Sequence, residues 1–183
     1  GGRCVVAFAK YLGIIDKQTN LAAFDGLHDA TISGNIVSLS MRDVDHVQTY
    51  PTHTFLDTGS PHHVEFVKDT KNLDVRTEGA LIAHNDTYGE EGTNVNFVEV
   101  GEAREIQLRT FERGVENETL SCGTGVTAAA LAAFSTGIVT NSKIVVHTLG
   151  GVLTVSFTPS GKGFSDIVLT GPTELVFSGT LEF

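Results

Sequence analysis

The sequence predicts an α+β fold of two pseudo-repeated domains, each a curved, mostly antiparallel sheet wrapped around a central helix. Alternating apolar and polar residues, the pattern of half-buried strands, recur along most of the 183 residues. Residues 126–134 break this pattern, because they are small, apolar and helix-prone on nearly every face. Such a helix must be buried on every side, so the strands are expected to curve around it.

A first helix is expected over residues 3–13, where the apolar run 5–9 leads to Gly13. Its start shows no N-terminal cap, which indicates a helix entered partway and a chain that lacks its opening segment. This helix and the strands after it resemble the plan of the second half. The expected domains are 1–44, the remainder of an N-terminal domain, 45–170, a C-terminal domain, and 171–183, a strand that returns to the first domain.

Turn residues separate the remaining elements. Gly34-Asn35 and Gly150-Gly151 are two-residue turns typical of hairpins, and the buried helix is expected to end at Gly137. Another helix is expected over residues 73–83. The expected strands are 30–33, 36–41, 54–56, 63–67, 94–100, 105–112, 143–147, 152–157, 167–170 and 174–177.

Composition excludes several classes of partner. The net charge of −10 and the pI near 5.0 argue against nucleic acid or an anionic membrane surface. No apolar run is long enough to cross a bilayer. Cys4 and Cys122 are too far apart in the sequence to form a disulfide framework or a zinc cluster, so no metal is expected. A reduced, cytoplasmic enzyme fits these observations.

Cys122 stands in the part of the sequence that is richest in chemistry. Ser-Cys-Gly-Thr-Gly directly precedes the buried helix, so free amide N–H groups can face an anion such as a substrate carboxylate. The helix dipole is also expected to lower the pKa of the Cys122 thiol. Phosphate binding is the alternative for such a turn, but no lysine follows the glycines and no G-x-G-x-x-G opens a βαβ unit.

Two further polar clusters lie earlier in the chain. Residues 57–63 end in the adjacent histidines His62 and His63, which point to opposite faces of a strand, so at most one is expected to reach a site. Asn94 and Asn96 share one face of another strand. Asparagine is disfavoured inside strands, which makes ligand binding an alternative to turn capping.

Taken in order, the motifs resemble those of the diaminopimelate epimerases. They are the opening G-G-R-C, similar to the end of that family's C-G-N-G-x-R-C, then G-S-P-H, N-V-N-F, E-R-G, S-C-G-T-G and the final G-P-T-E-L-V-F-S-G. The resemblance covers the whole chain. It implies epimerisation of LL-diaminopimelate to meso-diaminopimelate, a precursor of lysine and peptidoglycan, without a cofactor or a metal.

The resemblance also implies the reacting groups. Cys122 matches the second of the family's two catalytic cysteines, and His62 and Glu112 match the polar pair beside the thiols. Cys4 matches a helix-borne structural cysteine and not the first catalytic one.

The groups expected to bind the substrate follow in the same way. Asn94 and Arg113 match residues that hold the distal end of the substrate, and Gly123 and Thr124 match the amides that receive the reacting carboxylate. Ser60 stands where the family more often has asparagine, and its position implies a substrate contact.

The chemistry of epimerisation agrees with these residues. Inverting an α-carbon requires removal of a proton from one face and delivery to the other, so two facing thiols supply one base and one acid. Helix N-termini stabilise the negative charge that develops on the carboxylate, and Arg113 can bind a distal carboxylate in a bidentate way. Because the first catalytic cysteine is absent from the sequence, the 183 residues alone are expected to be inactive.

Two other functions are open from the sequence alone. A proline or hydroxyproline racemase-type enzyme of the same superfamily uses two thiols, but Glu112 and Arg113 before Cys122 favour a substrate with a second charged end. A non-catalytic amino-acid-binding module is the second alternative. The family association suggests a homodimer, although no sequence pattern specifies one.

Overall fold

In the computed structural model, which describes residues 1–101 and 105–182, twelve strands form one sheet. Along the sheet the order is β1-β2-β3-β12-β11-β10-β8-β7-β6-β5-β4, and β9 pairs with β8. The helices are α1 (Gly2–Tyr11), α2 (Val75–Ala83) and α3 (Gly123–Ser135). The strands are β1 (Gln18–Ala23), β2 (Gly26–Ser33), β3 (Ile36–Ser40), β4 (Gln48–Thr49), β5 (Thr54–Asp57), β6 (Pro61–Phe66), β7 (Asn94–Val100), β8 (Ile106–Glu112), β9 (Asn117–Thr119), β10 (Lys143–Thr148), β11 (Gly151–Ser160) and β12 (Gly163–Pro172).

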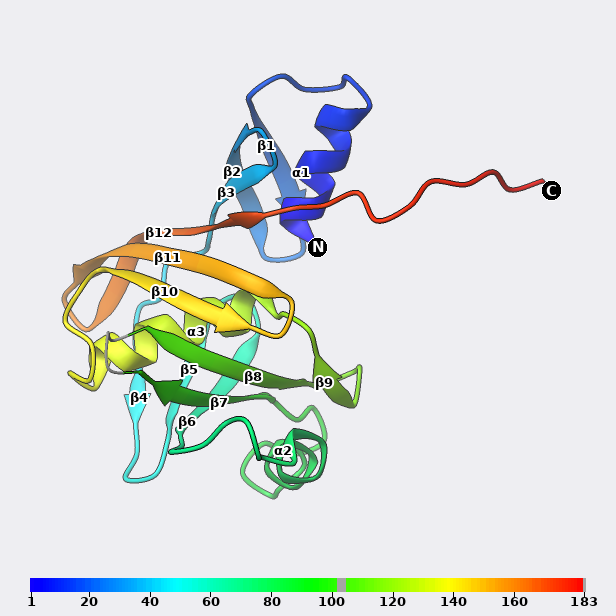
Figure 1. The fold of residues 1–183 in the computed structure, drawn as a ribbon. Coiled ribbons are helices and arrows are strands. Elements are labelled where there is room, and N and C mark those ends of the chain that lie inside the picture. Colours follow the sequence, from blue (N-terminus) through cyan, green and yellow to red (C-terminus); the bar gives the residue numbers. More distant parts are fainter. Residues whose placement is uncertain (102–104, 183) are drawn as a thin grey trace.

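The central helix α3 is buried as the sequence predicts. Its residues from Gly125 to Ala133 are all buried, and the strands that curve around it (Figure 1) and contact it are β5, β6, β7, β8, β10, β11 and β12. Alanine and glycine bring the helix backbone close to the sheet, and the larger side chains Phe134, Phe157 and Phe164 pack edge to face at its far end. The helix ends before Gly137, whose φ of 74° requires the left-handed conformation that favours glycine.

A smaller unit at the other end of the sheet contains α1 and the strands β1 to β3 (Figure 1). Helix α1 packs on these strands with Val6 as its buried residue. The core of this unit consists of Val6, Ala30, Ile32, Val37 and Leu39. The predicted helix end at Gly13 and the predicted hairpin at Gly34-Asn35 are both confirmed.

Strand β12 joins the two units. It pairs with β11 on one side and with β3 on the other, in a register that runs from Val168 opposite Ser40 to Pro172 opposite Ile36. Most neighbouring strands are antiparallel, as predicted, whereas β6 with β7 and β8 with β10 are parallel. The α+β prediction is therefore correct.

The predicted strand over residues 174–177 is wrong. Residues 173–182 carry no strand, and the tail extends away from the sheet (Figure 1). Thr173 bonds to the Asn35 carbonyl through both its amide and its hydroxyl, each at 2.9 Å, and the chain then leaves the sheet. A segment with alternating apolar and polar residues forms a strand only where a neighbouring strand is free to pair with it. The predicted boundaries 1–44, 45–170 and 171–183 stay a prediction, and Phe183 lies outside the described residues.

Three strands were not predicted. They are β1, β4 and β9. Both faces of β1 are largely exposed, so its residues show no alternation between apolar and polar side chains. The hairpin turn before β11 lies at Leu149-Gly150, one residue earlier than predicted, since Gly151 already pairs with Thr148. Short or exposed strands lack the alternation by which strands are recognised in a sequence.

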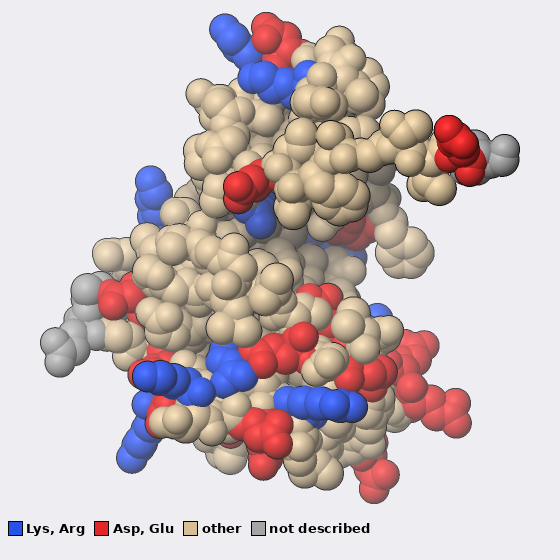
Figure 2. Space-filling view, turned by 45° about the vertical axis from the view of Figure 1, so that its right-hand side comes forward, with Lys and Arg blue, Asp and Glu red and all other residues tan. Residues whose placement is uncertain are grey.

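Charge is distributed unevenly over the surface. On the face in Figure 2, Lys and Arg side chains lie beside Asp and Glu over the lower part of the molecule and again at its top, whereas a broad area across the middle is largely uncharged. The exposed apolar residues of α1 include Val5, Phe8 and Tyr11. None of the helices in the described part of the chain is both long enough and apolar enough to span a bilayer.

Candidate active site

Cys122 is the residue that immediately precedes α3. Its backbone is extended, with φ of −110° and ψ of 112°, and its carbonyl accepts the first helical hydrogen bond from Val126 at 2.8 Å. The amides of Gly123 and Thr124 therefore belong to the first turn, where N–H groups have no partner within the helix. Gly125 is required here, because a Cβ would lie 2.5 Å from Asn96 Oδ1 and 3.4 Å from Cys122 Sγ.

A cavity of about 320 Å³ opens beside this helix start and is walled by both units of the sheet. Four of the eight predicted site residues line it, namely Glu112, Cys122, Gly123 and Thr124. The other lining residues are Gly1, Gly2, Arg3, Leu21, Ala23, Asp25, His28, Leu39, Met41, Ser121 and Leu169. The cavity therefore combines a thiol, a carboxylate and free backbone amides.

The predicted lowering of the Cys122 pKa is wrong. Burial raises the pKa of this thiol, and the neighbouring Glu112 carboxylate, which accepts a hydrogen bond from it, raises the pKa further. Hydrogen bonds from the Thr124 hydroxyl, at 3.4 Å, and from the Gly125 amide act in the opposite direction but are outweighed. The resting side chain is a neutral thiol, which can donate a proton.

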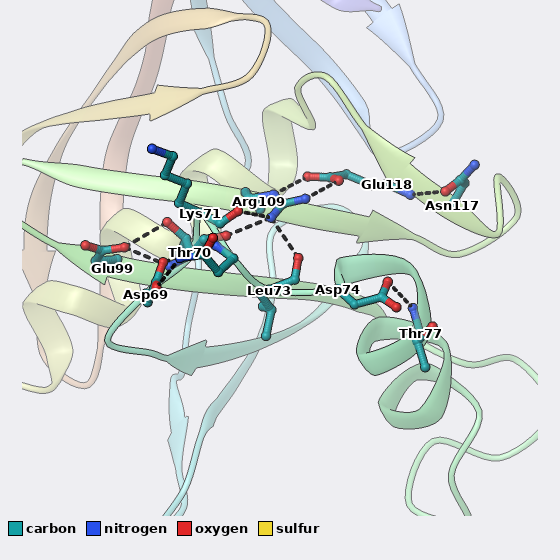
Figure 3. Close-up of polar contacts among 11 residues, drawn as sticks. Asp69, Thr70, Lys71, Leu73, Asp74, Thr77, Glu99, Arg109, Asn117 and Glu118 are labelled. Carbon is teal, nitrogen blue, oxygen red and sulfur yellow. Dashed lines mark hydrogen bonds and ion pairs between the residues drawn. The ribbon is translucent and has the colours of Figure 1, made fainter.

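Glu112 ends β8 and is held from the adjacent strand β9. The Thr119 hydroxyl donates to the Glu112 carboxylate. Strand β9 is anchored by Arg109, whose Nε and Nη2 each donate to the Glu118 carboxylate at 2.6 Å (Figure 3). Arg109 Nη1 also donates to backbone carbonyls of the segment before α2, among them that of Thr70 at 2.7 Å. The carboxylate beside Cys122 is thus fixed by a network that reaches α2.

Ser60, Asn94 and Arg113 form a second group, outside the lining of that cavity. Asn94 Nδ2 donates to Ser60 Oγ at 2.8 Å, and Asn94 Oδ1 accepts from the Arg113 amide at 3.2 Å. Arg113 Nη1 donates to the carbonyl of Glu91 at 3.0 Å. Its Nε and Nη2 donate to no residue in the described part of the chain. The Thr58 hydroxyl donates to the Thr124 carbonyl at 3.0 Å, which ties this group to the start of α3.

His62 lies in β6 and is fully buried. Its Nδ1 is 3.0 Å from Asn96 Nδ2, and its Nε2 has no hydrogen-bond partner among residues 1–101 and 105–182. Burial and the positive charge of Arg113 lower the pKa of His62 to about 3, so the ring is neutral near pH 7. His63 instead contacts Tyr88 and His53, which confirms that the two histidines point to opposite sides of the strand.

Sequence reasoning missed Asp25 and His28, which line the cavity from the smaller unit. His28 Nε2 is 2.9 Å from Asp25 Oδ1, and His28 Nδ1 is 2.7 Å from the Ser40 carbonyl. Burial opposes the charge on the ring, but these two acceptors together raise the pKa of His28. No local motif marks the pair, because Asp25 and His28 reach Cys122 only through the pairing of β3 with β12.

Cys4 takes no part in this cavity. It lies exposed on α1 and lines a separate, mainly apolar cavity between α1 and the segment that follows β12. The two cysteines of the sequence therefore do not face each other across one site.

The same fold occurs in solved structures. A hydroxyproline epimerase from Agrobacterium vitis matches 93% of this chain with a TM-score of 0.71 and 17% identity, and the chain spans 63% of that protein. A PhzF-family phenazine biosynthesis protein from Bacillus anthracis matches 91% of the chain with a TM-score of 0.69 and 12% identity. At these identities the likeness concerns the fold alone, so the chain shares the fold of these two proteins.

Sequence relatives identify the family, among the proteins with this fold, to which the chain belongs. A profile of the family described as diaminopimelate epimerase matches residues 54–176. A diaminopimelate epimerase of Flavobacterium psychrophilum is 50% identical over 99% of this chain and 71% of its own length, and one of Chlorobaculum tepidum is 41% identical over 99% and 73%. The chain belongs to the diaminopimelate epimerase family.

Proposed function

We propose that this chain provides the Cys122 half of an active site that epimerises LL-diaminopimelate to meso-diaminopimelate without a cofactor. The observation that carries the proposal is a thiol at the start of a buried helix, beside a carboxylate and free amides, in a chain of this family. The likeness to a hydroxyproline epimerase is limited to the fold and does not favour proline as the substrate.

The reacting carboxylate of the substrate binds at the start of α3. Gly123 and Thr124 line the cavity and belong to the first turn of α3, and the positive end of the helix dipole favours an anion there. As the α-proton leaves, negative charge spreads onto this carboxylate, and preorganised amides stabilise it without having to reorient.

Cys122 transfers the proton on one face of the α-carbon. In its neutral form it donates a proton, and in the opposite direction of the reaction its thiolate removes one. Glu112 accepts a hydrogen bond from the thiol and holds it in place. Its negative charge favours the neutral thiol, which is the form that donates.

The distal end of the substrate is bound by Ser60, Asn94 and Arg113. Nε and Nη2 of Arg113 donate to no described residue, so the guanidinium can bind a distal carboxylate through two parallel hydrogen bonds. The hydrogen bond between Asn94 and the Arg113 amide fixes the backbone from which this side chain extends.

The opposite face of the α-carbon needs a second proton-transfer group. Cys4 does not supply it, because Cys4 lines a different cavity. We therefore expect the 183-residue chain by itself to bind amino acids without inverting them. We also propose that the protein is cytoplasmic and forms a homodimer. Light scattering on the purified protein measures the oligomeric state.

Proton NMR in heavy water tests this function, with the product of the complete gene and diaminopimelate as substrate. Loss of the α-proton signal together with formation of the other stereoisomer is expected. Cys122→Ser should lower the exchange rate by roughly 10²–10⁴-fold, the contribution of a positioned proton-transfer group. Cys4→Ser, at the exposed thiol of the other cavity, is the matched control and should exchange normally.

Arg113→Ala tests the choice of substrate. It should abolish recognition of diaminopimelate while the Cys122 thiol keeps its reactivity, because only the distal carboxylate loses its partner. Arg76→Ala, at an exposed position of α2, is the control. Unchanged affinity of Arg113→Ala for diaminopimelate would contradict the assignment. Exchange with proline but not with diaminopimelate would identify a proline-type enzyme, and binding without exchange would identify a binding module.

A further inference from the structure

Asn96 is fully buried in β7 and connects three strands. Its Nδ2 donates to His62 Nδ1 at 3.0 Å and to the His63 carbonyl at 2.9 Å, both in β6. Its Oδ1 accepts a hydrogen bond from the Thr110 hydroxyl of β8 at 3.0 Å. Every donor of this carboxamide therefore has a partner among the described residues.

The His63 carbonyl determines which end of the Asn96 carboxamide faces β6. A backbone carbonyl oxygen can only accept, so the nitrogen and not the oxygen of Asn96 must lie against it. The NH₂ group carries two hydrogens. One is donated to His63, and the other points to the His62 ring.

This orientation determines the tautomer of His62. Because Asn96 donates to Nδ1, that ring nitrogen must be without a hydrogen. Burial and the charge of Arg113 keep the ring neutral, so its one N–H hydrogen lies on Nε2. Nε2 is fully buried and has no hydrogen-bond partner in residues 1–101 and 105–182. The side chain holds one buried N–H donor that the described protein does not use.

The network adjoins the proposed active site. Asn96 Oδ1 and Cys122 Sγ lie 2.5 Å and 3.4 Å from the point where a side chain on Gly125 would begin, so both groups border the first turn of α3. Asn96 is therefore placed between the strand that carries His62 and the helix start that carries the thiol.

We propose that Asn96 is a positioning residue, which holds His62 as the neutral tautomer with its hydrogen on Nε2, so that His62 serves the site as a hydrogen-bond donor and not as a base. The part of this inference that concerns the site rests on the proposed function. The part that concerns the tautomer rests on the hydrogen bonds of Asn96 and on the complete burial of the His62 ring. A buried donor without a protein partner is suited to a substrate oxygen on which negative charge develops.

Nitrogen NMR measures the tautomer directly. The experiment uses the complete gene product labelled with ¹⁵N-histidine, and His62→Gln identifies the His62 signals by their disappearance. A bare, pyridine-type Nδ1 and a protonated Nε2 are expected, unchanged between about pH 5 and about pH 8. A hydrogen on Nδ1 in the unmodified protein would overturn the proposal.

Two substitutions at Asn96 test the cause. Asp in Asn96→Asp can accept but not donate, so His62 Nδ1 should become protonated. Asn96→Ala removes the donor without adding a charge and should give a mixture of tautomers, which keeps the test available if the aspartate variant does not fold. Thr110→Val is the matched control, because it removes a buried hydrogen bond of Asn96 but leaves both donors of its nitrogen in place. A single Nε2–H tautomer in folded Asn96→Ala would refute the role of Asn96.

Turnover gives a separate readout. Folded Asn96→Ala should exchange the diaminopimelate α-proton about 10-fold to 100-fold more slowly, the range known for groups that orient metal-bound imidazoles. The expected tautomer with unchanged turnover would overturn the donor role of His62. If the unmodified protein did not turn over diaminopimelate, the proposed function would fail, while the NMR measurement would still decide the tautomer.

Discussion

Cys122 is subject to two opposing influences at one sulfur atom. A helix N-terminus stabilises a thiolate by about 0.3–1 kcal/mol, and up to about 2 kcal/mol in partly buried sites. Burial can shift a pKa by up to about 3–5 units, and one unit corresponds to about 1.4 kcal/mol. With 8% of Cys122 exposed and Glu112 nearby, burial exceeds the dipole and raises the pKa. The position of Cys122 directly before α3 could be predicted from the sequence, whereas the direction in which its pKa is shifted could not.

Alkylation should show this effect. In a pH series with iodoacetamide, Cys122 should react only above the pKa of about 8.5 of a free cysteine, because the thiolate is the nucleophile. Mass spectrometry of the digested protein measures labelling, with the exposed Cys4 in the same sample as a check on the reagent. Rapid labelling of Cys122 below about pH 7 would mean that the helix dipole prevails.

His28 should make stability depend on pH. Its folded-state pKa is raised because the Ser40 carbonyl and the Asp25 carboxylate outweigh burial. A raised pKa stabilises the fold fully below the unfolded value of about 6.5, and this contribution is lost as the pH rises through the folded value. The stability that the unmodified protein has in excess of a His28→Gln variant should therefore shrink as the pH rises from about 6 to about 9, and urea unfolding measures it.

The comparison of two variants isolates that contribution. His28→Gln should lower the free energy of unfolding more near about pH 6 than near about pH 9. His84→Gln, which loses an exposed pair with Glu116, should lower it by a small amount that changes little over this range. Equal slopes in the unmodified protein and His28→Gln would show that other groups cause the pH dependence.

Among the elements, β9 owes its position to one side chain. Arg109 binds Glu118 of β9 through two hydrogen bonds and also binds carbonyls of the segment before α2, including that of Leu73 at 2.8 Å (Figure 3). A three-residue strand has too few backbone bonds to be stable alone. The ion pair, with 19% of each side chain exposed, supplies the remaining stability and holds the strand that positions Glu112.

Arg109→Met should lower the free energy of unfolding by about 2–4 kcal/mol, because hydrogen bonds to charged groups are lost and the Glu118 carboxylate is left unpaired. Urea unfolding followed by circular dichroism measures the loss. Arg76→Met, at an exposed position of α2, controls for loss of a positive charge and should change stability by less than about 0.5 kcal/mol. Similar losses in both variants would rule out a specific role for the Arg109 network.

At the scale of the whole molecule, one sheet joins two cores of very different size. Five buried residues form the core around α1, whereas the core around α3 includes that helix and side chains from most of the surrounding strands. Strand β12 connects the two units by pairing with β3, and the hydroxyls of Ser38 in β3 and Thr170 in β12 lie 2.9 Å apart. The α1 unit therefore has less apolar burial to oppose local opening.

Hydrogen exchange should reveal this asymmetry. Amides of β1 and β2 are expected to exchange faster than those of β7 and β8, because exchange from the smaller unit does not require the α3 core to open. Amides of β3 should be protected more than those of β1, since β3 pairs with β12. Mass spectrometry of peptides after timed exchange measures each strand. Equal protection throughout would mean that the sheet opens as a single unit.

Local patterns in the sequence predicted most of the elements, and four of the eight residues proposed for the site line the Cys122 cavity. Alternation located most strands, and the composition of residues 126–134 identified a buried helix, because side-chain periodicity reports which faces avoid water. Glycines around Cys122 marked the start of that helix as the place for an anion. Motif order pointed to the family that the relatives later established.

Contacts between segments that are distant in the sequence became evident only in the folded chain. Pairing of β3 with β12 brings Asp25 and His28 to the cavity of Cys122, and pairing of β6 with β7 brings Asn96 to His62. Periodicity specifies the buried face of a strand but not its neighbour, so contacts between distant segments cannot be read from it. The Cys122 pKa depends on the burial that all these segments create together, which is why its direction became evident only in the folded chain.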